Sequence, residues 1–174
     1  MNREKNYIYT ERLILRRFSE SDFENYYDIL NQEEVSKWLG SGKRKSKEDV
    51  KNIMTSFQSD WDKNNYGVWA VIKKENNRLI GHCGLKHLKD IQEIELLYAF
   101  DPKFWGNGYA AESARAVIKF AQDELKFKRL VAVVYPNNNR SCNVIEKLGF
   151  KYKGERELFG VNLFYYELEL DLTV

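Results

Sequence analysis

Apolar and polar side chains alternate in several short stretches of the chain, a period that is typical of β-strands. In the first stretch, Leu13 and Leu15 lie on one face and Ile14 on the other. The dipeptide Asn76-Asn77 separates two later stretches and predicts a hairpin turn. The predicted strands cover residues 7–18, 66–74, 78–88, 94–100 and 130–135, followed by two strands around Gly160.

Helices are predicted between these strands, where apolar residues recur every three or four positions. Ser19-x-x-Asp22 and Ser46-x-x-Asp49 resemble N-terminal capping boxes in which Asp replaces the usual Glu. The most regular apolar face runs from Ala110 to Leu125, and a short helix follows Pro136-Asn-Asn-Asn139. Because strands and helices alternate without a linker, we expect one mixed α/β domain of the α+β type over residues 1–174.

Composition excludes several classes of protein. The 174 residues are 43% hydrophobic and 14% aromatic, which favours a packed domain over a disordered chain. Lys and Arg number 28 and Asp and Glu 26, so the formal charge of +2 disfavours binding to nucleic acid mainly through counterion release. Two cysteines cannot make a disulfide framework, and residues 1–5 lack the apolar segment of a secretion signal. We therefore expect a soluble cytoplasmic protein.

A glycine-containing turn, Lys103-Phe-Trp-Gly106-Asn-Gly108-Tyr-Ala, precedes the most regular helix. Free N–H groups and the positive end of the helix dipole favour an anion at such a position. Glycine lets the backbone approach a phosphate closely, although two glycines before a helix are also common in ordinary turns. The Walker A motif lacks its Gly-Lys-Ser/Thr, and Ala111 replaces the third glycine of the dinucleotide motif.

Three segments of the chain carry a family resemblance in the same order. They are Thr10-Glu-Arg-Leu-Ile-Leu-Arg16, Phe104-Trp-Gly-Asn-Gly-Tyr-Ala-Ala-Glu112, and Pro136-Asn-Asn-Asn-Arg-Ser141 with Glu146-Lys-Leu-Gly-Phe150. With them the chain resembles the GNAT superfamily of N-acetyltransferases, and more closely its RimJ/RimL-like branch. Lys103 departs from the family's Gln or Arg without removing a backbone donor. The resemblance implies a mixed, mostly antiparallel sheet of about six or seven strands, flanked by helices, with a splayed central strand pair.

The resemblance also implies acetyl-CoA as the cosubstrate. The main-chain N–H groups from Trp105 to Ala110 would bind its pyrophosphate, and its pantetheine arm would lie along the strand that ends at Phe100. A splay between this strand and residues 130–135 would admit the arm. Asn138 would contact the arm, and Ser141 would lie near the sulfur. The cofactor-binding residues implied in this way are Leu97, Tyr98, Ala99, Phe100, Lys103, Trp105, Gly106, Asn107, Gly108, Tyr109, Ala110, Asn138 and Ser141.

Acetyl transfer to an amine requires a neutral amine, support for the carbonyl oxyanion and a proton for the leaving thiolate. Glu95, with Glu93 on the same strand face, is the candidate base, directly or through water. Many superfamily members have a Tyr where this chain has Ile145, so Ser141 is the candidate acid. A backbone N–H near Leu97 would bind the oxyanion. As structural alternatives, Glu95 would be a solvent-facing or ion-paired strand carboxylate, and Ser141 would be a helix cap.

The other reactive residues do not indicate a metal site or a nucleophile. His82, Cys83 and His87 match no standard metal-ligand spacing, so we predict no metal. Cys142 has no His partner near it in sequence and is interpreted as a packed small residue. The basic run Lys43-Arg-Lys-Ser-Lys47 is interpreted as a solvated loop, or alternatively as a site for the 3′-phosphate of the cofactor or an acidic partner such as ribosomal RNA.

The resulting hypothesis is an acetyl-CoA-dependent N-acetyltransferase that works by direct attack in a ternary complex. The branch resemblance alone implies the first expected acceptor, the N-terminal α-amine of a protein such as a ribosomal protein. The second is a small amine such as a polyamine, amino acid or antibiotic. A non-catalytic CoA-binding module and an RNA-binding protein are the alternatives from other classes. No membrane partner is expected, nor nucleic acid except through a ribosomal substrate. A monomer and a homodimer that pairs through residues 150–172 both remain open.

Overall fold

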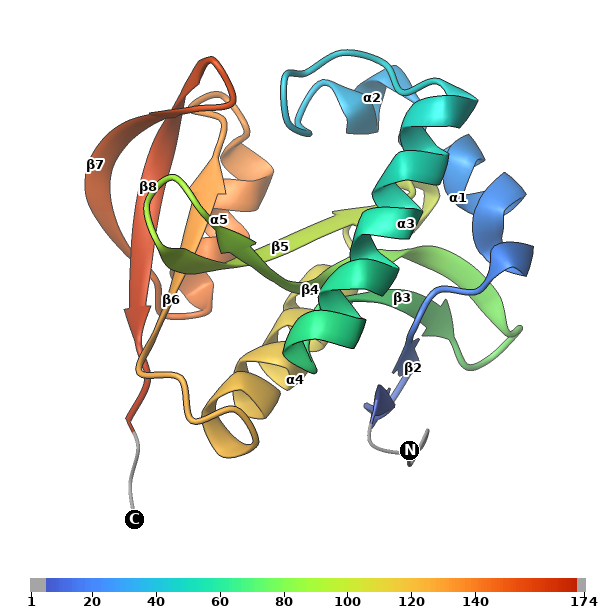
Figure 1. Cartoon of the computed structure of the whole chain (residues 1–174), viewed down its shortest axis with the longest axis horizontal. Helices are drawn as coiled ribbons and strands as arrows, with labels where there is room; N and C mark the ends of the chain where they lie inside the picture. The colour runs from blue at the N-terminus through green and yellow to red at the C-terminus, as the bar shows by residue number, and fades with distance from the viewer. Residues whose placement is uncertain (1–5, 172–174) are drawn as a thin grey trace.

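The computed structural model describes residues 6–171, whose strands form one eight-stranded sheet with helices on both faces (Figure 1). The strand order is β1-β2-β3-β4-β5-β6-β8-β7, and only the β5–β6 pair is parallel. The strands are β1 (Ile8–Tyr9), β2 (Leu13–Arg16), β3 (Val68–Lys73), β4 (Arg78–Leu88), β5 (Glu93–Phe100), β6 (Arg129–Val134), β7 (Lys151–Leu158) and β8 (Val161–Glu169). The expected mixed, mostly antiparallel fold is confirmed, with one strand more than the six or seven expected.

The additional strand comes from the first predicted one. Residues 7–18 form a short hairpin, in which Ile8 of β1 faces Leu15 of β2. Thr10 turns the chain, since its N–H donates to the Leu13 carbonyl and its hydroxyl oxygen accepts from the Leu13 N–H, both at 3.0 Å. The turn contains neither Gly nor Pro, so the alternating pattern ran through it without a visible break.

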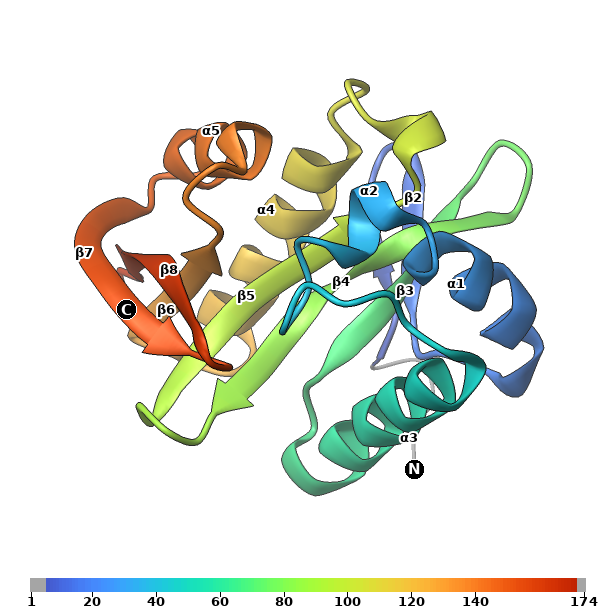
Figure 2. The same cartoon turned by 90° about the horizontal axis from the view of Figure 1, so that it is seen from above.

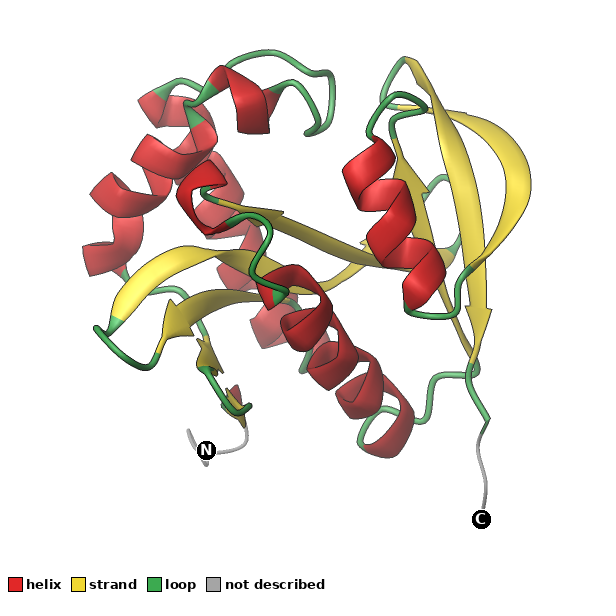
Figure 3. Ribbon diagram, turned by 180° about the vertical axis from the view of Figure 1, so that it is seen from behind, coloured by secondary structure: helices red, strands yellow, loops and turns green. Residues whose placement is uncertain are grey.

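Two layers of helix enclose the sheet. Figures 2 and 3 show α4 and α5 on one face, with α1, α2 and α3 on the other. The Ser46 cap is confirmed, because its hydroxyl accepts from the Asp49 N–H and Asp49 accepts from the Ser46 N–H. The helices are α1 (Phe23–Leu30), α2 (Glu33–Ser36), α3 (Lys47–Asn64), α4 (Tyr109–Asp123) and α5 (Asn139–Lys147), with 3-10 turns η2 (Glu20–Asp22) and η3 (Pro102–Phe104). The four-residue α2 has no counterpart in the sequence prediction.

Each face of the sheet has its own core. On one face, Ala114, Val117 and Ala121 of α4 are fully buried, and these small side chains bring the helix close to β4 and β5. On the same face Trp61 and Trp69 meet edge to face, with ring centroids 4.7 Å apart. Tyr26 and Phe57, from α1 and α3, pack over the opposite face. The two cores hold β5 rigidly between the helix layers.

The sheet opens between β5 and β6. Their one registered residue pair is Glu95 with Val131, whereas β5 pairs with β4 over the whole length of β5. The later residues of β5 therefore have main-chain groups that no registered partner on β6 covers. This opening is the expected splay.

No helix within residues 6–171 combines the length and the apolar character that a membrane crossing needs. The N-terminal residues 1–5, on which the expectation of no secretion signal rests, lie outside the described residues.

Candidate active site

The glycine loop forms an open cradle at the start of α4. Gly106 and Gly108 have φ values of +77° and +80°, which favour glycine over any residue with a Cβ. A Cβ at Gly106 would meet no heavy atom within 4 Å, and one at Gly108 would meet only an Arg12 nitrogen at 3.5 Å. No side chain caps the first turn of α4. The N–H groups at this end are therefore available to an anion.

The first hairpin anchors the cradle, a role that the sequence analysis did not recognise. The Glu112 carboxylate on α4 accepts hydrogen bonds from the Thr10 hydroxyl at 2.6 Å and from the Arg12 N–H at 2.9 Å. The Arg12 guanidinium also donates to Glu112 at 2.7 Å and to the Asn107 carbonyl at 2.9 Å. The first family-like segment, Thr10–Arg16, and the glycine loop are thus parts of one assembly.

Two loop residues differ from the expectation in detail. The Trp105 N–H is already used, because it donates to the Pro102 carbonyl at 3.1 Å. The Trp105 indole donates instead to the Phe100 carbonyl at 2.9 Å, and the Arg140 guanidinium lies 3.9 Å from the centre of its ring. Lys103 is exposed, and its N–H donates to the Asp101 carboxylate at 3.2 Å. The contribution of Trp105 is therefore its ring rather than its backbone donor.

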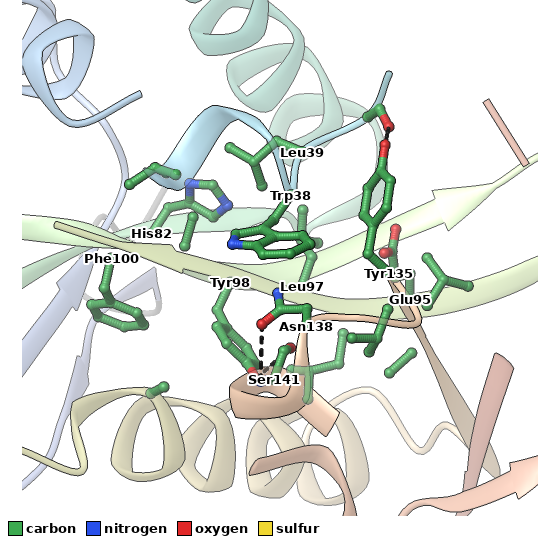
Figure 4. A pocket seen from close by; sticks show the side chains of 18 of the residues that line it. Trp38, Leu39, His82, Glu95, Leu97, Tyr98, Phe100, Tyr135, Asn138 and Ser141 are labelled. Atoms are coloured by element: carbon green, nitrogen blue, oxygen red, sulfur yellow. Dashed lines mark hydrogen bonds between the residues drawn. The ribbon is translucent and has the colours of Figure 1, made fainter. Parts of the chain in front are cut away.

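A cavity of about 400 Å³ passes through the opening between β5 and β6. Figure 4 shows Trp38, Leu39 and His82 on one side of β5 and Tyr98 and Ser141 on the other. Eight of the predicted cofactor residues line it: Leu97, Tyr98, Ala99, Phe100, Trp105, Ala110, Asn138 and Ser141. The remaining five, Lys103, Gly106, Asn107, Gly108 and Tyr109, lie in the adjoining loop and first helical residue. Cradle and cavity are thus continuous through Trp105 and Ala110.

Alternation along β5 gives each face of the strand a separate environment. Leu97 and Ala99 pack against the α1–α3 side, whereas Leu96, Tyr98 and Phe100 pack against the α4 side. By the same period Glu95 shares a face with Leu97. One strand therefore presents residues to both sides of the cavity.

Tyr98 and Ser141 form a pair of hydroxyl groups. Their oxygens are 2.9 Å apart, although 43 positions separate the residues in sequence. Burial raises the pKa of Tyr98 well above its usual value, so the phenol keeps its proton. Ile145, where many superfamily members have Tyr, is buried in the core. The chain thus supplies a phenol from β5 rather than from α5, which the sequence analysis missed by considering α5 alone.

Asn138, and not Ser141, caps α5. The Asn138 side-chain oxygen accepts a hydrogen bond from the Ser141 N–H at 3.3 Å. This contact fixes Asn138 at the wall of the cavity and leaves its amide nitrogen as a donor. Because the cap is made by Asn138, the Ser141 hydroxyl has only Tyr98 as a side-chain partner among the described residues.

Glu95 is buried, with 8% of its surface exposed. Burial raises the pKa of its carboxyl to about 7, and the positive charge of Lys86, opposite on β4, acts against this shift. Within residues 6–171 no cation lies within ion-pair distance of Glu95, whereas the neighbouring Glu93 pairs with Arg129. The ion-paired alternative therefore describes Glu93 and not Glu95. A carboxyl that is about half ionised near pH 7 has the property that a general base requires.

The mouth of the cavity is closed on one side by a bridge between separate segments. The Tyr135 hydroxyl, just after β6, donates to the Gly40 carbonyl at 2.6 Å. The Trp38 ring packs edge to face against Tyr135, with centroids 5.9 Å apart. Trp38 thus lines the cavity wall.

The basic run is an exposed loop except for Lys45, which is half-buried. Lys45 lines the cavity, and its ammonium group donates to the carbonyls of Leu39 at 3.2 Å and Lys43 at 2.8 Å. Arg44 and Lys47 form exposed ion pairs with Glu33 and Glu24, respectively. The run therefore secures the segment that leads from α2 to α3.

The other reactive residues from the sequence analysis form no metal site among the described residues. His82 accepts or donates a hydrogen bond with Tyr26 at 2.8 Å, and Cys83 and Cys142 are buried. Among the residues that the structure describes, no group of three or more His, Cys, Asp or Glu side chains could hold a metal ion.

Comparison with known proteins identifies relatives of the whole arrangement. The acetyltransferase (GNAT) domain family matches residues 12–151. The uncharacterized protein YkkB of Bacillus subtilis is 30% identical over 85% of this chain and 87% of its own. A GNAT-family acetyltransferase from Bacillus anthracis is 27% identical, covers 94% of this chain and 98% of its own, and superimposes with a TM-score of 0.81.

A more distant structure shares the fold. It is RimL, a ribosomal L7/L12 alpha-N-protein acetyltransferase in complex with coenzyme A, which is 17% identical with a TM-score of 0.81. The match covers 97% of this chain and 100% of the RimL chain. At this identity the likeness concerns the fold alone.

Proposed function

The chain belongs to the GNAT acetyltransferase family and is an N-acetyltransferase, and we propose that it transfers the acetyl group of acetyl-CoA directly to a primary amine between β5 and β6. One observation carries this proposal. A single cavity joins an open cradle of backbone donors, a pair of hydroxyl groups and a buried carboxylate from three separate segments.

The residues present fit acetyl-CoA. The N–H groups from Gly106 to Ala110 would bind the pyrophosphate, and Arg12 holds the loop that carries them. The uncovered main chain of β5 after Glu95 would bind the amides of the pantetheine arm, with the Asn138 amide nitrogen as a further donor. The thioester would then lie beside Leu97, whose N–H would bind the oxygen that becomes negative during transfer.

Glu95 would accept the proton that the attacking nitrogen loses, directly or through water. An α-amino group has a pKa of about 7.7–8.0, so a substantial fraction is neutral near pH 8, whereas a lysine-like amine near 10.4 needs more assistance. A base with a pKa of about 7 suits the first of these. This chemistry favours an N-terminal α-amine.

Ser141 would donate a hydrogen bond to the departing sulfur while it accepts one from the Tyr98 phenol, and water would carry to the thiolate the proton that Glu95 takes from the amine. The new C–N bond forms as the C–S bond breaks, so one proton leaves the amine and one reaches the thiolate. Because a free thiol has a pKa of about 8.5, a weak hydroxyl donor suffices. The hydroxyl pair favours catalysis over the alternative of a module that only binds CoA.

The expected acceptor is the N-terminal α-amine of a protein, and a ribosomal protein is the first candidate. RimL, which shares the fold, is a ribosomal L7/L12 alpha-N-protein acetyltransferase by its own description. A small amine is the second candidate.

The test is an acceptor screen with acetyl-CoA, in which released thiol and acetylated product are measured together. We expect a thermal shift with CoA, and equal amounts of thiol and product with at least one peptide N-terminus. A thermal shift without thiol release from any amine would support the binding module instead. No thermal shift at all would refute the cradle.

A further inference from the structure

The acceptor side of the cavity contains one polar group without a partner. Two buried polar side-chain atoms within the described residues, Ser36 Oγ and His82 Nε2, have no hydrogen-bond partner. Of these two residues, only His82 lines the cavity. A buried polar atom left unpaired costs about 1–3 kcal/mol, so its position at a cavity wall calls for an occupant that would pair with it.

The hydrogen bonds around His82 decide which of its nitrogens carries the proton. His82 Nδ1 is 2.8 Å from the Tyr26 hydroxyl, which has no other side-chain or main-chain partner in the described part of the chain. If Tyr26 donates to Nδ1, only the Nε2 proton lacks a partner. If Nδ1 donates to Tyr26, both Nε2 and the phenol proton lack one. The first arrangement leaves fewer buried groups unpaired and makes Nε2 a donor.

The ring is neutral and firmly held. Burial lowers the pKa of His82 to about 3, so it does not become cationic near neutral pH. The rings of Tyr26 and Phe57 both meet the imidazole edge to face, with centroids 5.8 Å away. The imidazole therefore presents one N–H in a fixed direction between aromatic walls.

The register of β4 and β5 gives the spacing along the sheet between His82 and Leu97, beside which the thioester is proposed to lie. His82 pairs with Ala99, which lies two residues beyond Leu97 on the same face of β5. Two residues of a strand span about 7 Å. In an extended peptide, the carbonyl of the second residue also lies about 7 Å from the terminal nitrogen.

The charged side chains that line the cavity disfavour a polycation as the acceptor. The charged residues of the cavity wall are Lys45, Lys86, Arg140 and Glu95. Three cations thus face one carboxyl, and that carboxyl is about half protonated near pH 7. A polyamine would meet repulsion from most of this lining.

Resting on the proposed function, we infer that His82 is the residue that selects the acceptor, by donating from Nε2 to a neutral carbonyl oxygen about 7 Å from the attacking amine. The acceptor class is an extended N-terminal peptide that is bound through the carbonyl of its second residue. Its first side chain would lie against apolar residues of the cavity lining such as Leu39 and Phe57. Tyr26 positions the ring by donating a hydrogen bond to Nδ1, which leaves the ring proton on Nε2.

The decisive experiment compares two acceptors of equal length. Alanyl-alanine amide has the second carbonyl, alanine isobutylamide lacks it, and spermidine serves as the polycation. We expect the wild-type kcat/KM to favour the dipeptide amide by about tenfold over the isobutylamide, one hydrogen bond's worth, and spermidine to react more slowly than either.

Substitution of the ring then tests the residue. His82→Phe keeps an aromatic ring but removes the Nε2 donor. The kcat/KM values for the dipeptide amide and the isobutylamide should then become about equal, while the CoA thermal shift stays unchanged. Tyr26→Phe frees Nδ1 to carry the proton instead and should reduce the preference severalfold. His87→Phe, on the same strand and outside the cavity wall, is the matched control and should keep the full preference.

The outcomes separate the two proposals. Turnover of both peptide analogues at equal kcat/KM by the wild type, or turnover of spermidine alone, would overturn the role of His82 and leave the acetyltransferase intact. Absence of turnover with every amine would overturn the proposed function and the acceptor assignment with it. If His82→Phe fails to fold, the wild-type ratio and Tyr26→Phe still decide.

Discussion

The two ends of the cavity are made of different chemical groups. The proposed cofactor end consists mainly of main-chain donors, shaped by Gly106 and Gly108 and held by Arg12. The acceptor end consists of side chains, such as Trp38 and His82, that come from separate segments. Backbone donors bind any ligand with the right phosphate geometry, whereas side chains change with each substitution. Substitutions of side chains should therefore alter the proposed acceptor end more readily than the proposed cofactor end.

Gly108→Glu should break the cofactor end most completely. The substitution places a Cβ at a φ of +80° and a carboxylate where the phosphates are expected, so we expect CoA affinity to fall by about 100-fold or more. Titration calorimetry with CoA measures this. Gly154→Glu is the matched control, because Gly154 has a φ of +105° and equally open surroundings on β7. Equal affinity in both variants would contradict the cradle.

Ser141→Ala should separate chemistry from binding at the cofactor end. Removal of a proton donor commonly costs about 100-fold in turnover, and the cofactor affinity should change little. Tyr98→Phe should cost about tenfold, and the double variant should be no slower than Ser141→Ala, since the two hydroxyls act as one unit. Steady-state kinetics at saturating CoA supply the four rates. Additive losses would show that the hydroxyls act independently.

Glu95→Gln tests the group between the two ends, with effects on rate and on stability. The folded pKa of Glu95 is raised to about 7 from 4.5, so the folded state holds an extra proton between these values and stability falls as pH rises through this range. At pH 8 the free energy of unfolding of the variant should exceed that of the wild type by up to about 3 kcal/mol. Below pH 4 this difference should be absent.

The same variant should lose turnover by about 100-fold, the lower end of the usual contribution of a general base. The wild-type kcat/KM should rise with pH through about 7 as Glu95 ionises, and the variant should lack this inflection. Denaturant melts and pH–rate profiles measure the two effects. A variant that gains stability but keeps the inflection would rule out Glu95 as the base.

Tyr135→Phe should have the smallest effect, confined to the acceptor end. It removes the hydrogen bond to the Gly40 carbonyl, worth about 1 kcal/mol, and so should raise the acceptor KM about fivefold. The Kd for CoA should not change. Tyr152→Phe, at an exposed tyrosine on β7, is the control. A fivefold rise in the CoA Kd would contradict the assignment of the Tyr135–Gly40 hydrogen bond to the acceptor end.

The glycine loop before α4 was predictable from sequence because its groups are close along the chain. The glycine loop lies directly between a predicted strand and the most regular helix, and the Ser46 cap is formed within three residues. Tyr98 and Ser141 could have been paired only through the fold, because 43 positions separate them. The pattern did place Tyr98 on the face opposite Leu97, and that signal was available.

The proposed acceptor end was not predictable, because its groups come from positions that are far apart in the sequence. Tyr26 and His82 are 56 positions apart, and their contact needs α1 packed over β4. The short α2 and the bridge from Tyr135 to Gly40 also depend on tertiary contacts rather than on local pattern. Arg12 was visible within a family-like segment, but its role required the position of Glu112 on α4.

The alternation of β5 means that a shift of a single residue would exchange the two substrates. Glu95 and Leu97 would turn toward the thiol, and Tyr98 would turn toward the amine. The eight residue pairs that join β5 to β4 prevent such a slip. Insertions or deletions of one residue in this strand should therefore be far less tolerated than any point substitution, whereas changes of two residues would keep both partners on their own sides.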